Sequence, residues 1–389
     1  MHYQNETNYI IYLLKCAIEK ETPKTPDTTI DWNIIYQLAK KHKIIPILCF
    51  AIIKLPKDYI QTILHMESYM LMYKQNLVLD ANRSYETEHL KSVFNSLKID
   101  FILLKGSIIK HYYPDTFMRR MSDIDILFRG TDFKTLDTIF ENLGYKVLQK
   151  GAKDTAYINP VNNIKIEMQP HLIDMGYSEW YEYLQDIWEK CSNDKHEYKM
   201  NLEDFYIYHI IHMAKHFKNG GIGLNHILDI HVMNLTFKPM DWNYIENELL
   251  KINLYKFNLT MQALVSYWFN NKNTINFSKE EMEIIAEYVF AGGAFGTKKQ
   301  QETNHIVTRG DHKLSYRKKL FPNSTIMINY YGEFLKKHKY FLPLYWIRLN
   351  FTRLLNYNKK TKQSIHHMSS ITESNISKTE KIFHICGLS

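Results

Sequence analysis

The sequence predicts an α+β fold in which a short mixed sheet with helices is flanked by helical regions on both sides. Short apolar runs bounded by turn residues gather between 91 and 185, whereas apolar residues recur at helical spacing before and after them. At 389 residues the chain exceeds the size at which single hydrophobic cores stop growing, so two or three subdomains are expected. We expect an N-terminal helical region (1–90), a core (91–185), a C-terminal helical region (186–355) and a polar, flexible tail (356–389).

The core is expected to begin with two strands joined by a helix. The continuous apolar run 101–104 is typical of a buried strand. Gly106 begins a helix that runs to about Tyr113, because Pro114 cannot continue it. The second strand is predicted over 124–128.

A second helix and two further strands complete the predicted core. Asp132 caps this helix and Gly144 ends it. The alternating segments 155–158 and 164–168 are joined by 159–163, whose Asn and Pro residues are typical of a turn. These two segments are therefore predicted to be antiparallel strands.

The regions outside the core follow helical periodicity. Trp32 and Ile35 follow Asp31, which caps the first turn of a predicted helix. Beyond about residue 180 the pattern is mostly helical through Tyr340. The tail is rich in Lys, Ser, Thr and Asn, so it is expected to be poorly ordered, although Ile382-Phe383 can dock.

Composition places the chain among ordinary globular proteins. The formal charge of +8 is spread along the sequence, so it favours a solvated surface over a nucleic-acid interface. No apolar run reaches the roughly 20 residues of a membrane helix, and the first residues lack the form of a signal peptide. The four cysteines are far apart and form no metal-type pair, which suits reduced thiols and a cytoplasmic location. They are Cys16, Cys49, Cys191 and Cys386.

Two carboxylates one residue apart are the main chemical signal. Asp123 and Asp125 point to the same side of the predicted strand, because strand side chains alternate. Their repulsion is relieved by divalent cations, and Mg²⁺ prefers carboxylate and phosphate oxygens. Glu167, which alternates with apolar residues on another strand, is the candidate third ligand. We predict two Mg²⁺ ions, with Mn²⁺ as a substitute; the alternatives are exposed carboxylates or ion pairs to arginine.

Basic and small residues near these acids are candidates for phosphate binding. Gly106 and Ser107 open a helix, whose free amides attract phosphate, although the pair also suits a plain helix cap. Lys105, Arg119 and Arg120 are placed to offset the charge of a bound phosphate group, and each is equally compatible with a surface charge.

Three histidines share one face of the helix predicted over 202–217. His209, His212 and His216 follow the i, i+3, i+7 spacing. Three roles are considered for these histidines: contact of His212 and His216 with an acceptor substrate, a structural role and, less favoured, zinc binding. Asp229 is a lone acid in an apolar helix and is a candidate anchor for a histidine or a core arginine.

The segments 103–107 and 122–127 resemble the signature of the DNA polymerase beta-like nucleotidyltransferase superfamily. That signature is an apolar-Gly-Ser turn followed by Asp-apolar-Asp on a strand. More narrowly, the chain is similar to a bacterial family of uncharacterised nucleotidyltransferases, with Lys105-Gly106 before the first helix and Gly144-Tyr145 after the next. One departure is Gln169, which stands where relatives often carry His.

The resemblance implies a polymerase beta-like core and a metal-dependent transfer of a nucleoside monophosphate. A nucleoside triphosphate would donate to a hydroxyl or phosphate of an unidentified acceptor, whether small molecule, protein or RNA, and release pyrophosphate. It also implies a third carboxylate at Glu167. The alternatives are a non-catalytic nucleotide-binding regulator and an enzyme that adds nucleotides to RNA ends. Plentiful Tyr but no organised basic, aromatic segment argues against the latter.

Overall fold

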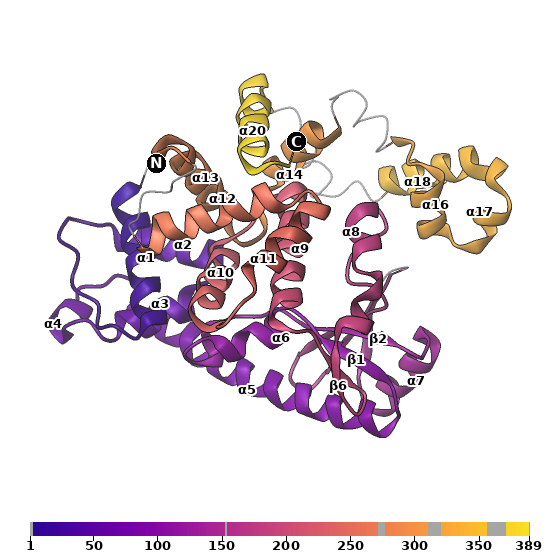
Figure 1. Ribbon diagram of the computed structural model, residues 1–389, viewed down its shortest axis with the longest axis horizontal. Coiled ribbons are helices and arrows are strands. Elements are labelled where there is room, and N and C mark those ends of the chain that lie inside the picture. Colours follow the sequence, from indigo (N-terminus) through magenta and orange to yellow (C-terminus); the bar gives the residue numbers. More distant parts are fainter. Residues whose placement is uncertain (1–2, 152–153, 271–276, 310–319, 356–370, 389) are drawn as a thin grey trace.

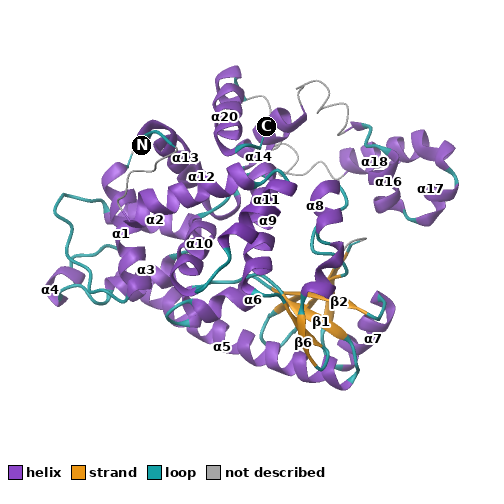
Figure 2. Ribbon diagram, viewed as in Figure 1, coloured by secondary structure: helices purple, strands orange, loops and turns teal. Residues whose placement is uncertain are grey.

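A computed structural model describes residues 3–151, 154–270, 277–309, 320–355 and 371–388 of the chain. Within them, seven strands form one mixed sheet in the order β3-β4-β5-β2-β1-β7-β6. The sheet is drawn in orange in Figure 2. The strands are β1 (Asp100–Leu103), β2 (Ile124–Arg129), β3 (Lys146–Lys150), β4 (Thr155–Ile158), β5 (Lys165–Gln169), β6 (Ser192–Asp194) and β7 (Glu197–Lys199). The rest is mostly helical, which agrees with the predicted α+β class.

Helices account for most of the chain before the sheet. They are α1 (Gln4–Glu19), α2 (Trp32–His42), α3 (Ile45–Ile52), α4 (Lys57–Ile60) and α5 (Met66–Ser96). Asp31 caps α2 by accepting a hydrogen bond from the amide of Asn33, as its position predicts. The long helix α5 runs from α3 along the base of the molecule to the sheet (Figure 1).

Further helices lie within and after the sheet. They are α6 (Gly106–Ile109), α7 (Phe133–Asn142), α8 (Ser178–Tyr183), α9 (Leu202–Asn219), α10 (Leu224–Thr236), α11 (Trp242–Lys251), α12 (Tyr255–Val265), α13 (Lys279–Gly292), α14 (Lys298–Arg309), α16 (Ser324–Tyr331), α17 (Glu333–Lys337), α18 (Leu342–Leu355) and α20 (Glu373–Cys386). None of the helices in the described ranges combines the length and the apolar character needed to cross a bilayer. Asp132 caps α7, as predicted.

The two faces of the sheet pack against different layers. Ile124 and Ile126 of β2 are fully buried against Phe94 of α5 and Phe140 of α7. Leu127, which points the other way, joins the large core that includes α9 and α10. The alternation predicted for this strand is therefore confirmed, and its second face is turned toward the helical body.

The centre of the sheet is formed by the two strands that carry the acids. β2 pairs antiparallel with β1 and parallel with β5. The β6–β7 hairpin pairs with β1 through β7, so the sheet continues past residue 185, where the sequence placed the end of the core. This hairpin is short and mostly polar, and its position depends on the edge that β1 presents.

Two segments differ from the expectation. The helix predicted from Gly106 to Tyr113 is one α-helical turn followed by a 3-10 turn over Lys110–Tyr112, in which the Tyr113 amide donates to the Lys110 carbonyl (3.3 Å). The tail, expected to be flexible, contains α20, which has a capping box at Thr372 and buries Ile382 and Phe383. Residues 356–370 lie outside the described part of the chain.

A small separate core lies near the C-terminal end. Met327 of α16, Leu335 of α17 and Leu349 of α18 are buried against one another. These three helices lie at the right edge of the molecule in Figure 1, away from the sheet. They do not contribute to the site described next.

Candidate functional site

The three predicted acids converge on one cavity. Asp125 of β2 lies directly opposite Glu167 of β5, because these parallel strands pair at this register position. Asp123 stands just before β2, on the same side as Asp125. All three line a cavity of about 460 Å³ between the sheet and α9–α10. The side-chain alternation that the sequence predicts for β2 and β5 thus places the three carboxylates on the same side of the sheet.

Most of the residues predicted for the site line this cavity. They are Lys105, Gly106, Arg119, Arg120, Asp123, Asp125, Glu167, His212 and His216. Ser107 does not: its side chain is buried, its hydroxyl has no partner among the described residues, and its amide donates to the Leu104 carbonyl (3.1 Å). The phosphate contact predicted for Ser107 therefore has no support in this conformation.

Gly106 allows close packing between the first turn of α6 and Met121. A Cβ atom added there would lie 2.7 Å from Cγ of Met121. Glycine thus lets the loop before Asp123 approach α6 closely, and its predicted role of admitting a phosphate stays a prediction.

Lys105 forms the closest contact within the acid cluster. Its Nζ donates to Oδ1 of Asp125 at 2.6 Å. Burial favours the neutral amine, but the negative charge of Asp125 outweighs it and raises the pKa of Lys105. The Lys105 backbone has a φ of 49° and a ψ of −120°, a strained conformation for a residue other than glycine. The sharp turn after β1 therefore places an ammonium group against the acids.

Burial and the neighbouring charge of Asp125 raise the pKa of the other two acids, Asp123 and Glu167. Burial and then the charge of Asp125 raise the pKa of Asp123. For Glu167, burial and again Asp125 raise the pKa to about 7. Three carboxyl groups therefore lie close together with one ammonium group, that of Lys105, in contact with them.

This donor set fits a divalent cation such as Mg²⁺. Carboxylate oxygens are its preferred protein ligands, and the Lys105 ammonium already stands where a positive charge is needed. In the described ranges, however, no group of three or more His, Cys, Asp or Glu side chains is preassembled at metal-binding distances. The residues that would hold the ion are Asp123, Asp125 and Glu167.

Arg119 is engaged in a buried ion pair. Its Nε donates to Oδ1 of Asp229 at 2.7 Å, and the Tyr113 hydroxyl donates to the same oxygen at 2.7 Å. Its Nη1 also donates to the Arg120 carbonyl at 2.7 Å, which ties the loop before Asp123 to α10. Asp229 thus anchors a core arginine, one of the two roles considered for it, and Arg119 is better placed to position this loop than to grip phosphate.

Neutral imidazoles form the wall opposite the sheet. Nε2 of His212 and Nε2 of His216 lie 2.9 Å apart on α9. Burial and the charge of Lys105 lower the pKa of both, that of His216 to about 4. Both rings are therefore uncharged near pH 7 and able to exchange hydrogen bonds with a substrate. His226 of α10 also lines this wall, which the sequence did not indicate.

Two further cations enter the cavity from helices before the core. Lys43 follows α2 and Arg83 lies in α5; both line the cavity. They stand about 80 and 40 residues before Asp123 in the chain and belong to no motif. An isolated basic residue in or just after a helix is typical of surface charge, so the sequence offered no signal for either of them.

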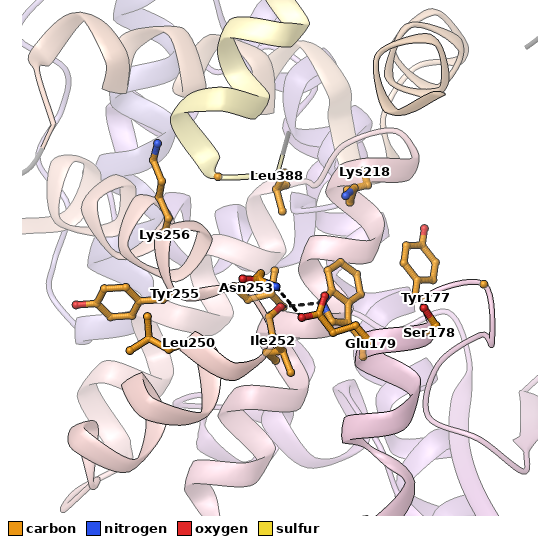
Figure 3. Close-up of a pocket in the computed structure, with 14 residues that line it drawn as sticks. Tyr177, Ser178, Glu179, Lys218, Leu250, Ile252, Asn253, Tyr255, Lys256 and Leu388 are labelled. Carbon is orange, nitrogen blue, oxygen red and sulfur yellow. Dashed lines mark hydrogen bonds between the residues drawn. The ribbon is translucent and has the colours of Figure 1, made fainter. Parts of the chain in front are cut away.

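A larger pocket of about 690 Å³ lies elsewhere and lacks this chemistry (Figure 3). It is formed by α8, α11, α12 and the last described residues. Its single carboxylate, Glu179, accepts a hydrogen bond from Asn253 (2.7 Å). The acid-lined cavity is therefore the candidate functional site.

Comparison with known proteins gives one match. Residues 28–270 match a family described as Uncharacterised nucleotidyltransferase. No curated protein and no solved structure matched significantly. The matched span includes the three acids, Lys105 and the histidine wall. Because it covers more than half of the 389 residues, the chain belongs to this uncharacterised nucleotidyltransferase family.

Proposed function

We propose that this chain is a Mg²⁺-dependent nucleotidyltransferase that moves a nucleoside monophosphate from a nucleoside triphosphate to a hydroxyl or phosphate of an acceptor, releasing pyrophosphate. The observation that carries the proposal is the convergence of Asp123, Asp125 and Glu167 on one cavity. Family membership supports the reaction class. The metal, the nucleotide and the acceptor belong to the proposal.

The reaction requires charge neutralisation more than covalent participation of the protein. The acceptor oxygen bonds to the α-phosphorus while the bond from that phosphorus to the bridging oxygen of pyrophosphate breaks. Pyrophosphate leaves with the electron pair, and a hydroxyl acceptor loses its proton. Mg²⁺ held by the three acids, with Mn²⁺ as a substitute, would supply the Lewis acidity for this displacement.

Different side chains of the cavity would act on the acceptor and on the nucleotide. Glu167, opposite Asp125 in the cavity, is suited to accept the proton of an acceptor hydroxyl. The neutral rings of His212 and His216 face the same cavity and can hydrogen-bond the acceptor. Lys105, beside Asp125, offsets charge on the phosphates.

The proposal is tested by incubating purified protein with each α-³²P-labelled triphosphate, Mg²⁺ and cell extract. The wild type is compared with the double variant Asp123→Asn, Asp125→Asn, and Asp194→Asn on the exposed strand β6 serves as a matched control. We expect labelling of an acceptor by the wild type and the control, and none by the double variant.

Equal labelling by the double variant would contradict the assignment of the acids. Labelling that persists in EDTA would contradict metal dependence. A protein that binds a triphosphate but releases no pyrophosphate with any acceptor would instead match the non-catalytic regulator.

A further inference from the structure

One end of the acid-lined cavity carries an excess of positive charge. Lys43, Arg83 and Arg120 line the cavity on the side of Asp123. The pKa of Lys43 and that of Arg83 are lowered by burial and then by the charge of Arg120, whereas Asp123 raises both. Arg120 therefore repels both Lys43 and Arg83, while Asp123 attracts both and Asp80 attracts Arg83.

Arg83 is the most unusual of the three. Its side chain is only 7% exposed, and its Nε has no hydrogen-bond partner among the described residues. Asp80 lies one turn earlier on α5, but its carboxylate is already bound by Lys110 (3.1 Å) and Thr116. A buried guanidinium without a paired anion is unfavourable, because its charge has lost the solvation of water and gained no partner.

The other two cations are also available to a ligand. Lys43 holds its Nζ 4.3 Å from the centre of the Phe295 ring, a contact that orients the amine without neutralising it. Within the described ranges the Arg120 side chain makes no ion pair, and only its carbonyl is bound, by Arg119. The nearby carboxylate of Asp123 accepts a hydrogen bond at Oδ1 from the Ser122 hydroxyl (2.8 Å).

We propose that Lys43, Arg83 and Arg120 bind the polyphosphate tail of the nucleotide, so that α2 and α5 complete the nucleotide site. A polyanion removes both the mutual repulsion and the unpaired state of Arg83, and arginine binds phosphate with two parallel hydrogen bonds. The identity of the anion as a nucleotide tail rests on the proposed function. The acceptor then enters at the opposite end, beside His212 and His216.

The test is calorimetric titration of the full chain with inorganic tripolyphosphate in Mg²⁺, with inorganic phosphate as the weak reference ligand. Arg83→Gln is expected to weaken tripolyphosphate binding about tenfold to a hundredfold, as for a lost charge-assisted contact. Arg83→Lys is expected to give an intermediate loss, since the charge remains but the fork is gone. Lys146→Gln, which removes a charge from the exposed strand β3, is expected to bind like the wild type.

The melting temperature of the ligand-free protein separates binding from structure. Because no described carboxylate pairs with the Arg83 guanidinium, Arg83→Gln is expected to melt at or above the wild-type temperature and to lose most of the upward shift that tripolyphosphate gives the wild type. Unchanged affinity in Arg83→Gln overturns the proposal. A lower melting temperature of ligand-free Arg83→Gln marks a structural role and also overturns it.

Failure of this site is distinguishable from failure of the proposed function. If tripolyphosphate binding depends on Arg83 but no acceptor is ever labelled, the transferase proposal fails and the site stands. If nucleotidyl transfer is observed and Arg83→Gln leaves the KM for the nucleotide unchanged, the transferase proposal stands and this site fails.

Discussion

Replacing Glu167 with Gln is expected to stabilise the metal-free protein while abolishing transfer. The carboxylate of Glu167 is partly buried beside Asp125, and together these effects raise its pKa from 4.5 to about 7. The shift of about 2.5 units, at 1.36 kcal/mol per unit, corresponds to about 3.4 kcal/mol. Because the side chain is partly exposed, solvent screening reduces the expected effect to about 2 kcal/mol.

The sign follows from proton linkage. The folded state holds its proton at Glu167 more tightly than the unfolded state, so the free energy of unfolding falls as pH rises from 4.5 to 7 and is level above that. Glu167→Gln removes this loss. The variant is therefore expected to exceed the wild type by about 2 kcal/mol at pH 8 and by less than about 1 kcal/mol at pH 5.

Urea denaturation in EDTA, followed by tryptophan fluorescence, measures both values. Glu141→Gln, an exposed change on α7, is the matched control and is expected to show no such pH dependence. Added Mg²⁺ is expected to raise the melting temperature of the wild type more than that of Glu167→Gln, since the variant lacks one ligand. A Glu167→Gln protein that is less stable than the wild type at pH 8 would refute this reasoning.

Three other changes probe the framework of the site. Gly106→Ala forces its new Cβ to within 2.7 Å of Met121, so thermal denaturation should show a loss of about 1–2 kcal/mol, and adding Met121→Ala should restore part of it. Asp229→Asn leaves Arg119 buried without its anion and is expected to cost about 3 kcal/mol in urea unfolding; an unchanged midpoint would count against the ion pair. Burial lowers the pKa of His42 from 6.5 to about 4, so the stability that the neutral ring contributes is complete above pH 6.5 and about 3 kcal/mol of it is lost as pH falls through 4. His42→Gln should flatten this dependence of the free energy of unfolding on pH. A variant whose curve runs parallel to that of the wild type would disprove the role of His42.

Local patterns in the sequence were sufficient for the strands that carry the acids. The order of side chains in 124–129 and 165–169 alternates with the period of a strand, which turns one face to the core whatever lies further along the chain. The caps at Asp31 and Asp132 are equally local, because each side chain bonds an amide two or three residues away.

Other elements depend on distant partners. The β6–β7 hairpin is a pair of three-residue strands whose place in the sheet is set by the open edge of β1, about 95 residues earlier. Apolar contacts of Ile382 and Phe383 hold the helix α20 in place. The composition of this segment alone suggests a polar tail. Such elements gain their stability from tertiary packing, which weak local preference does not reveal.

The sequence by itself determined that Asp123 and Asp125 share one side of a strand, and that an alternating Glu167 can stand on another. Only the tertiary structure decided that β2 and β5 are neighbours in register, and that α2 and α5 bring Lys43 and Arg83 to the same cavity. The physical reason is range: alternation and capping are fixed by residues a few positions apart, whereas the walls of a cavity are chosen by the packing of the whole chain.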